Sequence, residues 1–276
     1  MSTPSNTPQT LAFIGGGNMA SAIIGGLIKQ GTQPDRIVVV EPFADARTRL
    51  NSQFGVRTLA TADDNLAQAG LVIWAVKPQT FKEAAQQTRD FCANALHLSV
   101  AAGIRSDSIA NWLGTQRVVR AMPNTPALVG LGQTGLFART AVTPQDKAWI
   151  EQVIATTGAL LWVKDESLLD AVTAISGSGP AYVFFFIEAM VEAGVKMGLT
   201  PEQATQLAIG TFEGASLLAK TATEPPSVLR ERVTSKGGTT YAALTSMQNA
   251  RVGELFQVAL QAAQQRAHEL GDEFGA

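Results

Sequence analysis

Cysteine and histidine are scarce in this chain of 276 residues. The single cysteine, Cys92, excludes a disulfide within the chain and a cysteine-based zinc site. The two histidines, His97 and His268, are too few for a histidine-rich metal centre. We therefore expect no metal ion, and we expect both histidines to be structural.

Charged residues are also few, at 16% of the chain, and the formal net charge is −2. This balance favours neither nucleic acid nor an anionic membrane as a partner. The first ten residues lack the basic stretch and apolar run of a signal peptide. No uninterrupted apolar run reaches the roughly 20 residues of a membrane span. We expect a soluble, cytoplasmic protein with a small-molecule substrate and no nucleic-acid or membrane partner.

Apolar residues are abundant: 46% of the chain is hydrophobic, and there are 25 glycines. The length predicts one or two domains. The apolar excess indicates a buried interface between subunits.

Short apolar runs alternate with helical patterns in the first half of the chain. The runs are continuous, which is typical of parallel strands buried on both faces. We expect strands at 11–14, 37–40, 71–76, 96–100, 118–121, 135–138 and 159–163. We expect helices at 18–30, 45–54, 62–69, 79–90, 107–113 and 145–155. This repetition predicts an α/β domain, a doubly wound parallel sheet of the Rossmann type, over residues 1–163.

Residues 164–276 show helical patterns only, which predicts a second, all-α domain. Its helix opening at Gly179-Pro180 is apolar nearly all round, so it must be covered on every side. We prefer packing against a second copy of the chain, as a homodimer. A central helix within its own bundle is the alternative.

The segment Gly15-Gly16-Gly17-Asn18-Met19-Ala20 fits the pattern G-x-G-x-x-A between a predicted strand and a predicted helix. Gly15 permits the tight turn, Gly17 admits a pyrophosphate close to the backbone, and Ala20 lets the helix pack on the sheet. The free N–H groups of the helix start bind the anion. The motif predicts a dinucleotide site, and an ordinary glycine turn is the alternative.

Glu41 ends the second predicted strand, where an acid bonds the adenosine ribose and favours NADH. Arg47 and Arg49 follow and could instead meet the 2′-phosphate of NADPH, so both cofactors stay open. Two further segments follow predicted strands and therefore lie at the ligand edge of the sheet: Ala75-Val76-Lys77-Pro78 and Ala101-Ala102-Gly103. Lys77 is either a cofactor contact or a solvated lysine. Asn124, in a proline-bounded loop at the same edge, is a further candidate.

The segment Thr234-Ser235-Lys236-Gly237-Gly238-Thr239-Thr240 lies between helical patterns. Backbone N–H groups that converge at a helix start form a nest for an anion, such as a substrate carboxylate. A plain helix–helix turn is the alternative. The chain offers no obvious acid–base residue for carbonyl reduction. A protonated C=N bond is already electrophilic, so the sequence favours imine reduction by a reduced nicotinamide.

Together these motifs closely resemble those of the pyrroline-5-carboxylate reductase family. The resemblance spans nearly the whole chain and rests on six segments in order: Gly15–Met19, Ala75–Pro78, Ala101–Gly103, Met122–Pro126, Ser176–Tyr182 and Ser235–Thr240. It implies hydride transfer from NADPH or NADH to C5 of 1-pyrroline-5-carboxylate, which forms L-proline. It also implies a helical dimerisation domain and homodimers that often assemble into decamers.

The resemblance also implies roles for single residues. The backbone of Gly237, Gly238 and Thr239 and the Ser235 hydroxyl would hold the substrate carboxylate. Thr240 would face the ring nitrogen, and Glu166 falls where the family has a substrate-contacting acid. Lys236 stands where some members have proline, so its side chain is not expected to be essential.

Two alternatives remain. A β-hydroxyacid dehydrogenase has the same two-domain plan, but it needs a lysine soon after Ser176–Gly179, and none occurs before Lys196. A non-catalytic dinucleotide-sensing module would not need the nest at Ser235–Thr240.

Overall fold

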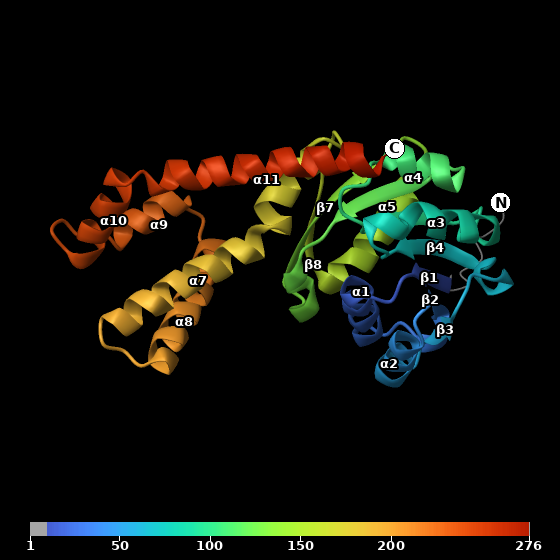
Figure 1. Cartoon of the computed structure of the whole chain (residues 1–276), viewed down its shortest axis with the longest axis horizontal. Coiled ribbons are helices and arrows are strands. Elements are labelled where there is room, and N and C mark those ends of the chain that lie inside the picture. Colours follow the sequence, from blue (N-terminus) through green and yellow to red (C-terminus); the bar gives the residue numbers. More distant parts are fainter. Residues whose placement is uncertain (1–9, 276) are drawn as a thin grey trace. The chain divides into compact units, whose positions relative to one another are not determined.

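The computed structural model describes residues 10–275 (Figure 1). Eight strands form one sheet in the order β3-β2-β1-β4-β5-β6-β7-β8. The strands are β1 (Thr10–Ile14), β2 (Ile37–Val40), β3 (Arg57–Leu59), β4 (Ala69–Trp74), β5 (Leu96–Ser99), β6 (Val118–Met122), β7 (Gly132–Ala138) and β8 (Gly158–Trp162).

Helices cover both faces of this sheet, as the sequence predicts for a doubly wound fold. They are α1 (Asn18–Lys29), α2 (Ala44–Phe54), α3 (Pro78–Thr88), α4 (Ser106–Leu113) and α5 (Pro144–Ile154). Successive residues of β1 alternate between two cores, with Phe13 in one and Ile14 in the other. The first core includes apolar residues of α1, α2 and α5, and the second includes those of α3 and α4. The Rossmann-type fold is therefore confirmed.

Three details of the sequence interpretation are wrong. β7 runs antiparallel to β6, because the short connection between them holds only a 3₁₀ turn at Thr125–Val129, without the crossover that a parallel pair needs. The helix expected at 62–69 is a 3₁₀ turn, Asp64–Leu66, whose start is capped by the Asp63 carboxylate. The short edge strand β3 was not predicted, since its three residues do not form an apolar run.

After β8, the described residues form helices only, as expected. These are α6 (Leu168–Val172), a π-helical turn at Thr173–Gly177, α7 (Gly179–Lys196), α8 (Pro201–Thr221), α9 (Pro226–Arg232), α10 (Thr239–Asn249) and α11 (Val252–Phe274). Of the residues that the structure describes, 10–178 and 263–275 form the first compact unit, and 179–262 form the second. The last strand, β8, ends at Trp162, whereas the compact units divide after Ser178 and again near Ala263.

In the second unit, α7 and α8 lie side by side (Figure 1). Their close approach requires Gly194, because a Cβ there would lie 2.9 Å from Cβ of Ala204. Phe256 of α11 packs edge-on against Tyr182 and Phe186 of α7, with ring centroids 5.7 and 5.6 Å apart.

Much of the apolar surface of α7 is uncovered in the single chain. Phe184 and Phe185 are 61% and 65% exposed. The continuous helix Leu168–Lys196 is long and apolar enough to cross a membrane by length and composition, which the sequence reading did not anticipate. A surface of this kind on a helix marks a contact with another molecule.

Candidate active site

The loops that hold the predicted dinucleotide residues meet at one edge of the sheet. Strands β1 to β6 are parallel, and β1 lies between β2 and β4, so the chain reverses its winding direction there. Ligands of such folds bind at this switch point, beside the carboxyl ends of the strands. Five of these ends are followed, at once or after one residue, by predicted segments: Gly15–Ala20, Glu41, Ala75–Pro78, Ala101–Gly103 and Asn124.

The first glycine of the motif is required by its backbone and by its neighbours. Gly15 has φ +94°, and a Cβ there would lie 2.7 Å from the carbonyl oxygen of Ala75. Gly17 is the N-cap of α1 and adopts extended backbone with no side-chain cap, so N–H groups of the first turn are left for a ligand. Ala20 is fully buried against the sheet. The turn therefore has the geometry of an anion site at a helix N-terminus.

Glu41 is buried and holds the glycine turn. Its Oε2 accepts a hydrogen bond of 2.8 Å from the N–H of Gly16, and its Oε1 accepts one of 3.0 Å from the N–H of Phe43. Arg47 donates to the carbonyls of Glu41 and Pro42 at 2.9 and 2.7 Å. An acid and a guanidinium thus adjoin at the end of β2, where the sequence left NADH and NADPH open.

The remaining dinucleotide candidates differ in exposure. Lys77 is the exposed N-cap residue of α3, and Pro78 is its first residue, while Ala75 and Val76 are half-buried. In the loop after β5, Ala101 and Gly103 are buried, and Ala102 is exposed. Gly103 has φ +73°, and a Cβ there would lie 3.1 Å from Leu270 and 3.2 Å from Phe274 near the end of α11. The loop after β5 is therefore packed from one side and open on the other.

Asn124 is buried and bonded on both sides of its amide. Its Nδ2 donates to the carbonyl of Ser176 at 3.1 Å, and its Oδ1 accepts from the N–H of Gln133 at 2.8 Å. It joins the π-helical turn to the start of β7 at the ligand edge of the sheet.

Glu166 lies in the first unit, where both oxygens of its carboxylate accept hydrogen bonds from other residues of the chain. Its Oε1 accepts from the N–H of Ser106 at 2.6 Å and from Nη1 of Arg120 at 3.0 Å, and its Oε2 accepts from the Ser106 hydroxyl. Ser106 and Arg120 were not singled out from the sequence. The available signal was a lone charge, Arg120, inside the apolar strand β6.

The predicted substrate nest lies in the second unit, between α9 and α10. Gly237 has φ +75°, and the N–H of Gly238 donates to the carbonyl of Ser235 at 3.0 Å. Gly238 is the N-cap of α10 without a side-chain cap, so Thr239 and Thr240 begin the helix with N–H groups available to an anion. A Cβ at Gly238 would lie 2.7 Å from the Ser235 hydroxyl, so glycine lets this hydroxyl stay beside the nest.

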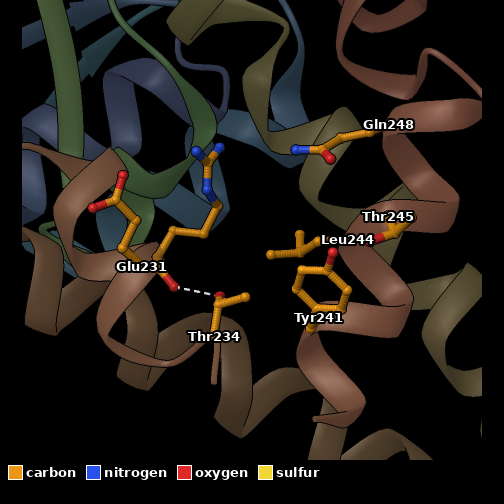
Figure 2. A pocket seen from close by; sticks show the side chains of 7 residues that line it. Glu231, Thr234, Tyr241, Leu244, Thr245 and Gln248 are labelled. Atoms are coloured by element: carbon orange, nitrogen blue, oxygen red, sulfur yellow. Dashed lines mark hydrogen bonds between the residues drawn. The ribbon is translucent and has the colours of Figure 1, made fainter. Parts of the chain in front are cut away.

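A pocket of about 180 Å³ lies between the same two helices (Figure 2). Seven residues line it: Arg230, Glu231, Thr234, Tyr241, Leu244, Thr245 and Gln248. Two of these residues flank the nest in the sequence: Thr234 precedes Ser235, and Tyr241 follows Thr240.

The histidines contribute nothing to either set of loops. His97 is buried within β5, and its Nδ1 accepts a 3.1 Å hydrogen bond from Trp74. Burial, with the charge of Arg117, lowers the pKa of His97 to about 4. His268 pairs with Asp170 at 3.3 Å on the surface. Over residues 10–275, no three His, Cys, Asp or Glu side chains gather to hold a metal ion.

Two family models match the chain. Residues 166–270 match pyrroline-5-carboxylate reductase dimerisation, and residues 10–103 match NADP oxidoreductase, coenzyme F420-dependent. The pyrroline-5-carboxylate reductase of Pseudomonas aeruginosa is 42% identical over 272 residues, which cover 98% of this chain and 99% of that protein.

Solved structures give the same result. The structure of a pyrroline-5-carboxylate reductase from Coxiella burnetii has a TM-score of 0.89 and 39% identity, and the match covers 96% of this chain and 99% of that one. A Plasmodium falciparum pyrroline carboxylate reductase with NADP bound has a TM-score of 0.84 and 26% identity, with 96% and 98% covered. The fold, the dinucleotide edge and these full-length similarities together show that the chain belongs to the pyrroline-5-carboxylate reductase family of oxidoreductases.

Proposed function

We propose that this protein reduces 1-pyrroline-5-carboxylate to L-proline with NADPH or NADH, as the final step of proline biosynthesis. The hydride goes to C5 of the C=N bond, and the ring nitrogen carries the proton, so the dinucleotide is oxidised as the imine becomes an amine. The observation that carries the proposal is the pairing of two features in one chain. They are a dinucleotide edge built from five loops and a carboxylate nest at Ser235–Thr240.

The residues at the sheet edge suit a reduced dinucleotide. We assign the pyrophosphate to the helix start at Gly15–Ala20, where the turn leaves N–H groups free. We assign the adenosine ribose to Glu41 and its neighbouring arginines, and the nicotinamide side to Ala75–Pro78, Ala101–Gly103 and Asn124. The bound dinucleotide supplies the hydride, and the protein positions the ring.

The nest suits the substrate carboxylate. We assign the carboxylate to the N–H groups of Gly237 and Thr239 and to the Ser235 hydroxyl beside them. Gly238, expected to contribute as well, spends its N–H on the carbonyl of Ser235, and Thr240 is assigned to the ring nitrogen. Neither histidine is near these residues in the chain or among their bonded partners, so the reaction depends on positioning a protonated imine.

The exposed apolar surface of α7 falls inside the segment that matches the dimerisation family. We propose that domain 164–276 joins two copies into a homodimer that can assemble further into a decamer. Coverage of α7 by a second copy accounts for its apolar surface without a membrane. We also propose that the protein is cytoplasmic, as a soluble enzyme of amino-acid biosynthesis.

The test is oxidation of NADPH or NADH by the purified full chain on addition of pyrroline-5-carboxylate. We expect turnover with at least one dinucleotide. Initial rates with each at one substrate concentration decide the preference, since Glu41 favours NADH and the adjacent arginines favour NADPH. Dinucleotide binding without turnover would reject the proposal in favour of a sensing module.

The substrate assignment is tested by Thr240→Ala. We expect slower turnover with an unchanged dinucleotide dissociation constant, because the nest and the dinucleotide edge belong to different compact units. Equal loss of both would indicate misfolding.

A further inference from the structure

The loop after β5 leads directly into α4, and the start of α4 is held by a residue from a distant part of the chain. Glu166 follows β8 in the sequence and lies 60 positions after Ser106, the first residue of α4. Its two carboxylate oxygens accept both the N–H and the hydroxyl of Ser106, at 2.6 and 2.5 Å. A carboxylate in this position satisfies an N–H group of the first turn and also complements the positive end of the helix.

Buried charge fixes the carboxylate in turn. Arg120 of β6 is only 4% exposed, and its Nη1 donates to Glu166 at 3.0 Å. Arg139, after β7, donates to the Ser106 hydroxyl at 3.1 Å and pairs with Asp107. Arg120, through Glu166, and Arg139, directly, therefore hold the first two residues of α4.

The loop has little freedom between these supports. The N–H of Val100 donates to the carbonyl of Trp74 in β4, and Gly103 packs against Leu270 and Phe274. Arg105, the N-cap residue of α4, pairs with Asp272 at 2.7 Å. Displacing the start of α4 would therefore move Ala101–Gly103 at the dinucleotide edge.

We propose that Glu166 is a positioning residue for the dinucleotide: with Arg120 and Ser106 it fixes the start of α4, and so holds the Ala101–Gly103 loop in place for the nicotinamide side. This inference rests on the proposed function and replaces direct substrate contact as the role of Glu166.

Two variants weaken the network at different points. Glu166→Gln keeps the size of the side chain but removes its charge and one acceptor oxygen. Ser106→Ala removes one hydroxyl and keeps the N–H bond to Glu166. Asp170→Asn is the matched control, because it also removes a carboxylate from this segment, yet the partner of Asp170 is His268 on α11 and no residue of α4.

The first measurement is the dissociation constant of NADPH and of NADH without substrate, for thermally stable variants. We expect Glu166→Gln and Ser106→Ala to raise it by about fivefold, the effect of one lost hydrogen bond. The KM for pyrroline-5-carboxylate at saturating dinucleotide should stay within about twofold of wild type. A raised KM would report a lost contact with the substrate, and neither variant removes one. Asp170→Asn should leave both values unchanged.

Other results would overturn the inference. An increased substrate KM in Glu166→Gln, with unchanged dinucleotide binding, would make Glu166 a substrate contact. Unchanged dinucleotide affinity in both variants would mean that Glu166, Ser106 and Arg120 stabilise the fold without positioning the dinucleotide. Because binding is measured without substrate, a wild-type protein that binds dinucleotide but turns nothing over would reject the proposed function and still leave this comparison decisive.

Discussion

At the scale of single residues, the site depends on positions whose backbone or neighbours require one particular amino acid. Gly15 combines positive φ with a carbonyl oxygen at the place where a Cβ would stand. Glu41 fits because its two oxygens meet two backbone N–H groups. Such positions fix the backbone before a ligand arrives, which reduces the ordering cost of binding.

We predict that Gly15→Ala prevents dinucleotide binding and destabilises the protein by about 1–3 kcal/mol. Gly31→Ala is the control, because Gly31 has a similar φ of +100° but open space around its Cβ position. The melting temperature should fall in both variants because each is strained, whereas titration with dinucleotide should show lost affinity in Gly15→Ala alone. Normal affinity in Gly15→Ala would contradict the assigned role of this turn.

His97 makes stability depend on pH. Its pKa is about 4 in the folded protein against 6.5 for the ordinary residue. Because the folded pKa is depressed, the unfolded state binds more protons, so this stability is present above about pH 6.5 and is lost as the pH falls toward 4. The full contribution is about 3 kcal/mol.

The check is urea unfolding of wild type and His97→Asn between pH 4.5 and 7.5. In the wild type, Nε1 of Trp74 donates to Nδ1 of His97, and the side-chain oxygen of asparagine can accept the same hydrogen bond. We expect the difference in free energy of unfolding between the two proteins to change with pH across this range. A constant difference would mean that His97 does not carry the effect.

At the scale of elements, the sequence predicted the strands and helices that depend on neighbouring residues. The strands of the sheet's centre appear in the sequence as continuous apolar runs because both their faces are buried. The start of α8 is just as local, because the side chains of Thr200 and Gln203 each accept the backbone N–H of the other residue. The direction of β7 and the bonds of Glu166 escaped prediction, since they depend on pairings between residues far apart in the chain.

The start of α10 gives a prediction at this scale. Gly238→Ala should raise the KM for pyrroline-5-carboxylate about tenfold, because its Cβ would displace the Ser235 hydroxyl from the nest, and it should leave dinucleotide affinity intact. Gly210→Ala within α8 has open space at its Cβ position and should be neutral or slightly stabilising. Steady-state kinetics of the pair decides; equal KM values would remove the nest from the substrate site.

At the scale of the whole molecule, the apolar surface of α7 calls for a partner. We predict that the wild-type chain sediments as a dimer or a larger assembly, and that Phe184→Glu with Phe185→Glu shifts it to a monomer, because both rings are more than half exposed in the single chain. Phe43→Glu changes an even more exposed ring in the first unit and should leave the assembly intact. A wild-type monomer in analytical ultracentrifugation would contradict the homodimer.

The first unit is discontinuous in sequence, since its last stretch, residues 263–275, follows the helical unit along the chain. During synthesis, the ribosome must therefore translate the whole helical unit before Leu270 and Phe274 can close over the loop at Gly103. Until then, that patch of the sheet unit stays bare and open to chaperones or to aggregation. A chain that stops within α11 after Ala262 would accordingly keep its whole helical unit and yet leave the first unit unfinished.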